Sequence, residues 1–133
     1  MREFSLKIVT PDGVQYDGVA EELIVRTTTG DVGILAGHIN YVAPLGMGQA
    51  TVQISGQRRK GACIGGMVSV IDGKVNLLPT TFEWEDAIDV ARAKVSEARA
   101  QEVLASKDAT DNEILMAKAR LKRALVRKGV AGK

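Results

Sequence analysis

The 133-residue chain has little of the chemistry on which disulfide-stabilised, membrane-spanning and metal-cluster proteins depend. Its single cysteine, Cys63, excludes an intramolecular disulfide and a thiolate-bound metal cluster. No apolar run approaches the roughly 20 residues that a helix needs to cross a bilayer, and the N-terminus lacks the apolar core of a signal peptide. The sequence therefore predicts a protein that lies in the cytosol or faces it.

Candidate catalytic groups are equally scarce. His38 is the only histidine, and the HExxH, CxxC and GxSxG motifs are absent. The stretch GDVGILAGH contains Gly30, Gly33 and Gly37, but it lacks the P-loop lysine and the GxGxxG spacing, which favours a turn-rich loop. A lone histidine without a partner is more often structural, or part of a contact surface, than a general base. This composition disfavours an enzyme.

Glycine divides the chain into two halves. Of its fourteen glycines, twelve lie between Gly13 and Gly73, and none lies from Lys74 to Lys128. The first half alternates β-branched and polar residues between turn signals, which indicates strands. A Gly-first turn is expected within TVQIS-GQ-RRKGACI, and a hairpin turn at Asp72-Gly73. Many short strands at this spacing predict an antiparallel β-sandwich or flattened barrel over residues 1–84.

The second half, residues 85–133, is rich in helix-forming Ala, Leu, Glu, Lys and Arg. Asp86 is the predicted N-cap of a helix that ends near Ala105, with Asp89 in its first turn. The stretch SKDATDNE then interrupts the helical pattern. Because the connection is short, the helices on either side of it are expected to form an antiparallel hairpin.

The second helix begins with a recognisable signal. Thr110-x-x-Glu113 is a capping-box signature, and this helix is expected to end near Lys128, before Gly129. Two apolar stripes at three-and-four spacing are predicted to form the seam: Ile88, Ala91, Val95 and Ala98 in the first helix, and Ile114, Ala117, Leu121 and Ala124 in the second. A hairpin of fewer than 50 residues with an alanine-rich seam buries too little apolar surface to be stable alone. We expect it to dock on the β-domain, on a partner, or alternately on both.

Charge is unevenly distributed along the chain. From Lys118 to the end there are seven basic residues and no acidic one. Such a segment suits an anionic partner, which leaves nucleic acid, lipid headgroups, nucleotide phosphates and acidic protein surfaces open, beside a merely solvated helix face. A nucleic-acid-binding module led by this basic helix is the main rival function. The near-neutral first half has no role in it, and the five aromatic residues offer no evident set for base stacking.

Arginines recur on one face of each predicted helix. Arg92 and Arg99 are seven residues apart in the first helix, and Arg123 and Arg127 are four apart in the second. In an antiparallel hairpin the start of the first helix lies level with the end of the second, so these groups and Asp89 are expected to come close together. Guanidinium groups gathered in this way repel unless an anion lies between them, and a polyphosphate would serve. A simple ion pair of Asp89 with an arginine across the seam is the alternative.

Two motifs make the chain similar to a known family. VTPDGVQYDGVAEELIVRTTTGDVGILAGHINYVAPL contains an early V-T-P, then G-x-x-G-I-L-x-G-H and a following P-L, and IDVARA matches an I/L-D-x-x-R-A motif. With these motifs the chain resembles the epsilon subunits of F-type ATP synthases, over essentially its whole length, and in particular the bacterial members that bind ATP in a C-terminal helical hairpin. It departs from them at Asn40, where a proline is common.

The resemblance implies a non-catalytic subunit of the central stalk, on the cytoplasmic side of the cell membrane and held there only through the complex. The sandwich would contact the gamma subunit and the c-ring and couple proton flow to ATP synthesis. The hairpin would inhibit ATP hydrolysis by extending toward the catalytic alpha and beta subunits, and nucleic acid would not be a partner. The compact hairpin would bind ATP, with or without Mg²⁺, as a regulatory ligand.

The resemblance also assigns ATP contacts residue by residue. Ile88 and Asp89 would meet the adenine, and four arginines would meet the phosphates. The full set of implied contacts is Glu83, Ile88, Asp89, Arg92, Ala93, Arg99, Arg123 and Arg127. No catalytic residue and no metal ligand is implied.

Overall fold

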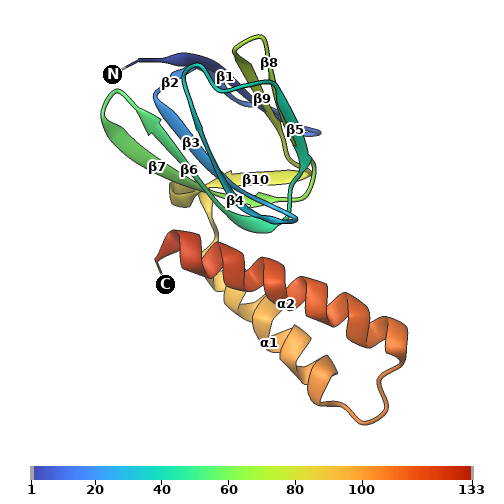
Figure 1. Cartoon of the computed structure of the whole chain (residues 1–133). Coiled ribbons are helices and arrows are strands. Elements are labelled where there is room, and N and C mark those ends of the chain that lie inside the picture. The colour runs from blue at the N-terminus through green and yellow to red at the C-terminus, as the bar shows by residue number, and fades with distance from the viewer. Residues whose placement is uncertain (1, 133) are drawn as a thin grey trace. The chain divides into compact units, whose positions relative to one another are not determined.

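The computed structural model describes residues 2–132 and consists of two compact units that meet between Glu85 and Asp86 (Figure 1). The first unit is a sandwich of two β-sheets, and the second is a hairpin of two long helices. The predicted fold class is therefore confirmed. Within the described residues no helix is apolar over the length that a bilayer would require.

The first sheet has the strand order β2-β1-β9-β8-β5. Its strands are β2 (Gly13–Ala20), β1 (Phe4–Thr10), β9 (Lys74–Leu78), β8 (Met67–Ile71) and β5 (Tyr41–Pro44). Neighbours in this sheet run antiparallel except β1 and β9, which are parallel with Ser5 opposite Lys74. The parallel pair joins the N-terminal strand to a hairpin from the far end of the unit, a pairing that local sequence patterns do not reveal.

The second sheet has the order β10-β7-β6-β3-β4 and is antiparallel throughout its printed ladders. Its strands are β10 (Thr81–Trp84), β7 (Gln57–Ile64), β6 (Met47–Ile54), β3 (Glu22–Thr27) and β4 (Gly30–Leu35). The two sheets face one another, as Figure 1 shows, and alternate side chains of each point into the space between them. Side chains that are fully buried there include Leu6, Ile8, Leu23, Val25, Ile34, Val52, Val68 and Leu77.

Two hairpin turns show where the sequence patterns were sufficient and where they were not. Asp72-Gly73 forms the predicted two-residue turn, with φ of +51° and +78° and Ile71 opposite Lys74. The predicted Gly56-Gln57 turn is wrong by one residue, because Ser55 and Gly56 form the turn, with φ of +51° and +77°. Two successive positive φ values match the twist of the flanking strands better than a Gly-first turn. The Glu21 carboxylate accepts a hydrogen bond from the Gly56 amide at 2.6 Å and holds this turn in place.

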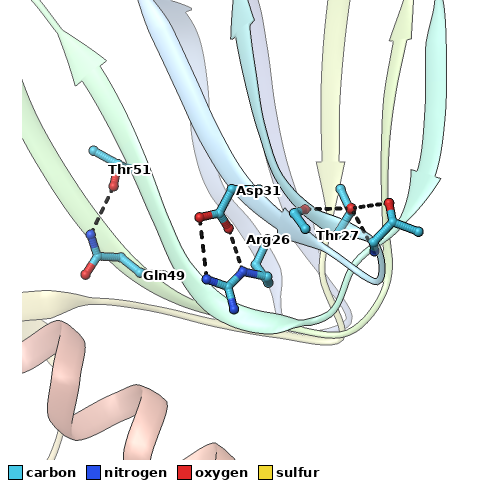
Figure 2. Close-up of polar contacts among 7 residues, drawn as sticks. Arg26, Thr27, Asp31, Gln49 and Thr51 are labelled. Carbon is cyan, nitrogen blue, oxygen red and sulfur yellow. Dashed lines mark hydrogen bonds and ion pairs between the residues drawn. The ribbon is translucent and has the colours of Figure 1, made fainter.

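Side-chain hydrogen bonds also hold the β3–β4 hairpin (Figure 2). Thr27 donates to the Gly30 carbonyl at 2.7 Å and accepts from the Thr29 amide at 3.2 Å. Arg26 contacts Asp31 through both carboxylate oxygens, and its hydrogen bond lowers the pKa of that exposed carboxyl. The hairpin tip is thus ordered by local polar contacts instead of apolar burial.

Asn40 has a specific role in the loop before β5. Its side-chain oxygen accepts a hydrogen bond from the Asp72 amide at 2.9 Å, which ties this loop to the β8–β9 turn. A proline at this position would lack that acceptor. At this position the chain therefore restrains the loop by a side-chain hydrogen bond, where a proline would restrain it by its fixed φ.

The helices begin and end near, but not always at, the predicted residues. Residues Glu85–Ala87 form a short 3₁₀ turn, and α1 spans Val90–Ala105 with Asp89 as its N-cap. The predicted N-cap at Asp86 is wrong, because the Asp89 carboxylate satisfies a free amide of the first turn, at 3.0 Å from the Arg92 nitrogen. The end at Ala105 is confirmed.

Helix α2 spans Asp111–Ala131, and its predicted start is confirmed in detail. Thr110 accepts from the Glu113 amide at 3.1 Å while Glu113 accepts from the Thr110 amide at 3.2 Å, a complete capping box. These bonds lower the pKa of the Glu113 carboxyl. The predicted end near Lys128 is wrong: Gly129 continues the helix, and Gly132 supplies the left-handed cap at φ +75°.

The seam between α1 and α2 is built on alanine at seven-residue spacing. Ala117 and Ala124 of the predicted α2 stripe are buried. The predicted α1 stripe is wrong, since Ala91, Val95 and Ala98 are exposed. Ala93 and Ala100 are buried instead. Alanine occurs on several faces of α1, so its spacing alone does not select the face that packs on α2.

Candidate functional site

A groove on one flank of the hairpin brings basic side chains of both helices together. It is lined by Arg92, Val95, Ser96 and Arg99 of α1 and by Arg120 of α2, and its volume is about 280 Å³. Arg92 and Arg99 lie two turns apart on the same face of α1 because they are seven residues apart. Val95 is 49 % exposed and presents an apolar surface between them. The groove therefore combines three guanidinium groups with one hydroxyl and one apolar side chain.

The charge in this groove is not neutralised. Among the residues that the structure describes, no carboxylate lies within ion-pairing distance of Arg92, Arg99 or Arg120. Like charges brought to one place raise the electrostatic energy of the compact hairpin, and an anion between them lowers it. Guanidinium groups match phosphate oxygens in a bidentate geometry. The groove is thus suited to a phosphorylated ligand.

The opposite flank of the hairpin is closed by an ion pair. Lys128 of α2 donates to Glu97 of α1 at 2.6 Å, with both side chains at least three-quarters buried. This contact joins the two helices on the flank away from the groove.

Asp89 occupies the outer end of the candidate site. Asp89 lies just before α1, three residues before Arg92 of the groove. Because the helices are antiparallel, Arg123 and Arg127, which follow Arg120 along α2, lie toward this end of the hairpin, and their proximity to Asp89 stays a prediction. The alternative in which Asp89 pairs with an arginine across the seam is wrong for the described residues, because its side chain caps α1.

The remaining predicted contacts have diverse surroundings. Ile88 is half-buried just before α1, and Ala93 is buried in the seam, where it has only a methyl group and backbone to offer a ligand. Glu83 lies in β10 of the first unit, opposite Ala62 of β7. Arg123 and Arg127 are half-buried on α2 and are not among the groove's lining residues.

Arg120 is the residue that the predicted site omitted. It precedes Arg123 by three residues and Arg127 by seven, so the helical period places all three on one flank of α2. That spacing was a usable signal. The spacing alone does not decide which of the three meets the α1 arginines, because the register of the hairpin depends on tertiary packing.

Other reactive side chains are engaged structurally. His38 Nδ1 lies 2.8 Å from the Ile39 carbonyl oxygen, and its ring meets Tyr41 edge-on. Burial raises the pKa of the Cys63 thiol to about 12, so the thiol stays protonated and unreactive at neutral pH. Within residues 2–132 no cluster of three or more His, Cys, Asp or Glu is arranged to hold a metal ion.

The sandwich carries a second feature, an apolar row across the outer face of its first sheet. We define this outer row as Pro44, Met67, Leu78, Val9 and Val14. The registers Pro44–Met67, Met67–Leu78 and Val9–Val14 place these residues side by side, and Leu78 and Val9 follow the paired residues Leu77 and Ile8. Met67 is 42 % exposed, Leu78 40 % and Val14 58 %. An apolar row that continues over five strands is typical of a docking surface.

Comparison with known proteins gives matches over both units. A family model described as the beta-sandwich domain of the ATP synthase delta/epsilon chain matches residues 3–85, and one described as its long alpha-helix domain matches residues 86–132. The chain is 41 % identical to the ATP synthase epsilon chain of Ruminococcus albus, over all of this chain and 99 % of that one. It is also 41 % identical to the epsilon chain of Bacillus pumilus, over the whole of both chains.

Solved structures share the fold at lower identity. A chain in a mitochondrial ATP synthase structure from Euglena gracilis superposes with a TM-score of 0.84 at 21 % identity, over 96 % of this chain and 80 % of that one. A chain in a central stalk and c-ring structure from Tetrahymena thermophila gives a TM-score of 0.62 at 14 % identity, over 96 % and 95 % of the two chains.

Proposed function

The chain belongs to the ATP synthase delta/epsilon family, and we propose from this premise that it is the epsilon subunit in the central stalk of a proton-translocating F-type ATP synthase. Its full-length match to bacterial epsilon chains supports this assignment for the whole chain and not only for one domain. In this role the protein is a non-catalytic subunit that helps to couple proton flow to ATP synthesis. It is held peripherally at the cytoplasmic side of the cell membrane through the complex.

The sandwich would carry the contacts with the gamma subunit and the c-ring. The outer row supports a protein partner, because an exposed apolar surface over five strands gains stability when another protein covers it. It lies on the first sheet, on the face turned away from the core. We assign the outer row to the gamma subunit.

Met67→Glu is expected to weaken assembly of the chain with its gamma subunit at least ten-fold, because a buried unpaired carboxylate costs several kcal/mol. Co-purification or calorimetric titration with the gamma subunit measures this. Lys7→Glu, on an exposed position of β1 outside the outer row, is the matched control. Equal affinity of the Met67 variant and the native chain would contradict this docking surface.

The hairpin would bind ATP in its compact state. The observation that carries this proposal is the groove in which Arg92 and Arg99 stand without a carboxylate partner among the described residues. Phosphates would lie on these arginines and on Arg123 and Arg127, and the adenine would lie toward Ile88 and Asp89. The Asp89 carboxylate has a second oxygen to accept a hydrogen bond from the exocyclic amine of adenine. Glu83 and Ala93 complete the proposed contact set, and Mg²⁺ is an optional companion of the phosphates.

ATP would regulate hydrolysis by stabilising the compact hairpin. Because alanine contributes little apolar area, the seam holds the helices together only weakly. A ligand that binds the compact form alone stabilises it by about 1.4 kcal/mol at ten times its Kd. When ATP is scarce, the hairpin would extend toward the catalytic alpha and beta subunits, and its basic α2 would be drawn to acidic surfaces there. Hydrolysis is then inhibited.

Replacing both Asp89 and Arg92 by alanine is expected to weaken ATP binding at least ten-fold, because each loses a charge-assisted hydrogen bond. Isothermal titration of the full chain with ATP, with and without Mg²⁺, measures this. Lys94→Ala, an exposed change on the same helix outside the groove, is the control. Unchanged affinity of the double variant would rule out the site.

A second variant separates recognition from helix capping. Asp89→Ser keeps an N-cap acceptor for the Arg92 amide but removes the carboxylate that would face adenine. We expect the native chain to prefer ATP to GTP and this variant to lose that preference. Equal GTP and ATP affinity in the native chain would argue against adenine recognition by Asp89.

The nucleic-acid alternative finds less support in the structure. Trp84 is covered by the Arg59 guanidinium at 3.8 Å from its ring centre and meets Phe82 and Tyr16 edge-on. Its ring is therefore not free to stack on a base. Salt-sensitive retention on DNA, together with no affinity for a gamma subunit, would favour the nucleic-acid-binding function over the central-stalk function.

A further inference from the structure

Arg120 is the one guanidinium that α2 contributes to the groove, and the family contact pattern does not include it. Together with Arg92 and Arg99 it surrounds a space of about 280 Å³ that opens to solvent. The three arginines come from two consecutive helices, α1 and α2. Only the folded hairpin brings them together.

The lining of the groove is selective for an anion. None of its five lining side chains is acidic, and Ser96 adds a neutral hydroxyl that can donate to a phosphate oxygen. Elsewhere on the hairpin the cations have different surroundings: Lys128 is paired with Glu97, and Lys122 is exposed outside the groove. A concentration of charge at Arg120 is therefore a local property of this flank and not a general property of the basic helix.

Resting on the ATP-binding function proposed above, we propose that Arg120 is a phosphate-binding residue that makes the groove an oligophosphate site with a preference for triphosphates over diphosphates. Three separate guanidiniums can each engage a different phosphate group, and a chain of three phosphates supplies enough charge and length to reach all of them. An anion held between Arg120 and the α1 arginines also bridges the two helices. Binding at Arg120 thus acts directly on the compactness of the hairpin.

The test uses the full chain and two probes, sodium tripolyphosphate and ATP, with ADP for comparison, by isothermal titration in a chloride buffer. Arg120→Ala is expected to lower the affinity of the chain for tripolyphosphate and for ATP about ten-fold, because a charged hydrogen-bonding partner is lost. ADP affinity should change less, so the ATP-to-ADP ratio falls. The triphosphate affinity of Arg120→Lys should lie between that of the native chain and that of Arg120→Ala, because lysine keeps the charge without the bidentate geometry.

Lys122→Ala is the matched control, since it removes one positive charge from the same helix outside the groove. Its affinities should equal those of the native chain, and circular dichroism should show equal helicity in all variants. Equal losses of triphosphate affinity in Lys122→Ala and Arg120→Ala would show a general effect of charge and would overturn the inference. So would unchanged affinity of Arg120→Ala for both triphosphates, or failure of the native chain to bind tripolyphosphate.

These outcomes distinguish this inference from the function on which it rests. If ATP binds equally to the native chain and to Arg120→Ala, the nucleotide site is supported and the phosphate-binding role of Arg120 is contradicted. If ATP fails to bind the native chain while tripolyphosphate binds in an Arg120-dependent way, the nucleotide function falls and the oligophosphate site stands.

Discussion

Replacing Gly66 by alanine is expected to lower the free energy of unfolding of the sandwich by about 4 kcal/mol. Gly66 lies between β7 and β8 at φ +90°, a conformation that side chains other than glycine rarely adopt. A Cβ here would approach the Leu78 carbonyl oxygen to 2.0 Å and the Pro79 Cα to 2.7 Å. Both obstacles are backbone atoms, so the β9–β10 connection would have to move.

Backbone hydrogen bonds also hold the Gly65-Gly66 turn to neighbouring segments. The Gly66 carbonyl accepts a hydrogen bond from the Leu45 amide at 2.8 Å. The Gly65 amide donates to the Gly46 carbonyl at 3.0 Å, and the Gly65 carbonyl accepts from the Thr80 amide at 3.3 Å. A shift that relieved the new Cβ would therefore strain contacts with the segments before β6 and after β9. This is why the expected cost exceeds that of an unfavourable φ alone.

Gly73→Ala is the matched control for Gly66→Ala. Gly73 also has a positive φ, +78°, but a Cβ there would meet nothing within 4 Å. Its expected cost is the backbone strain alone, about 1–2 kcal/mol. Urea unfolding followed by the fluorescence of Trp84, the only tryptophan, measures both variants. Similar costs for the two substitutions would show that the close approach at Gly66 does not decide stability.

Ala100→Leu is expected to separate the two helices and to weaken ATP binding by more than ten-fold, because the groove needs side chains from both helices. Ala100 is fully buried in the α1–α2 seam, and Ala124 of α2 is 1 % exposed. Three additional carbon atoms have no room between backbones that approach over alanine. We expect the compact hairpin to lose about 2 kcal/mol of stability relative to separated helices.

Ala98→Leu provides the contrast, since Ala98 lies on the exposed side of the same helix. It adds the same atoms without entering the seam, so ATP affinity should stay within about two-fold of the native value. Calorimetry for ATP and circular dichroism for helicity test both variants. If Ala98→Leu proved the more damaging of the two, the observed seam would be wrong and the stripe predicted from sequence would be right.

The alanine seam connects the packing of the hairpin to the regulatory role proposed for it. Small side chains allow close approach but contribute little burial energy each. The Lys128–Glu97 pair adds one partly buried electrostatic contact on the flank away from the groove. On the groove flank, Arg92, Arg99 and Arg120 have no carboxylate partner among the described residues, and their mutual repulsion opposes compaction until an anion binds. If the hairpin binds ATP as proposed, this balance would make it respond to the ligand, whereas a leucine seam would keep it closed.

The sequence by itself determined the two-domain plan, the Asp72-Gly73 hairpin turn, the capping box at Thr110 and Glu113, and the family resemblance. Each of these depends on residues no more than a few positions apart, or on a linear motif, and therefore needs no knowledge of distant partners. The loss of alternating strand patterns after residue 84 likewise marked the boundary region before any contact was known.

Only the tertiary structure decided which face of α1 is buried, and hence which arginines share a groove. Alanine and valine occur on several faces of α1, so periodicity alone left the rotation of the helix about its axis open. Ala93 and Ala100 are the α1 alanines that are buried with Ala117 and Ala124 of α2, and this rotation of α1 brings Arg92 and Arg99 to the flank on which Arg120 lies. The physical reason is that a helix is specified by neighbours within one turn, whereas a site shared by two helices depends on how closely their backbones can approach.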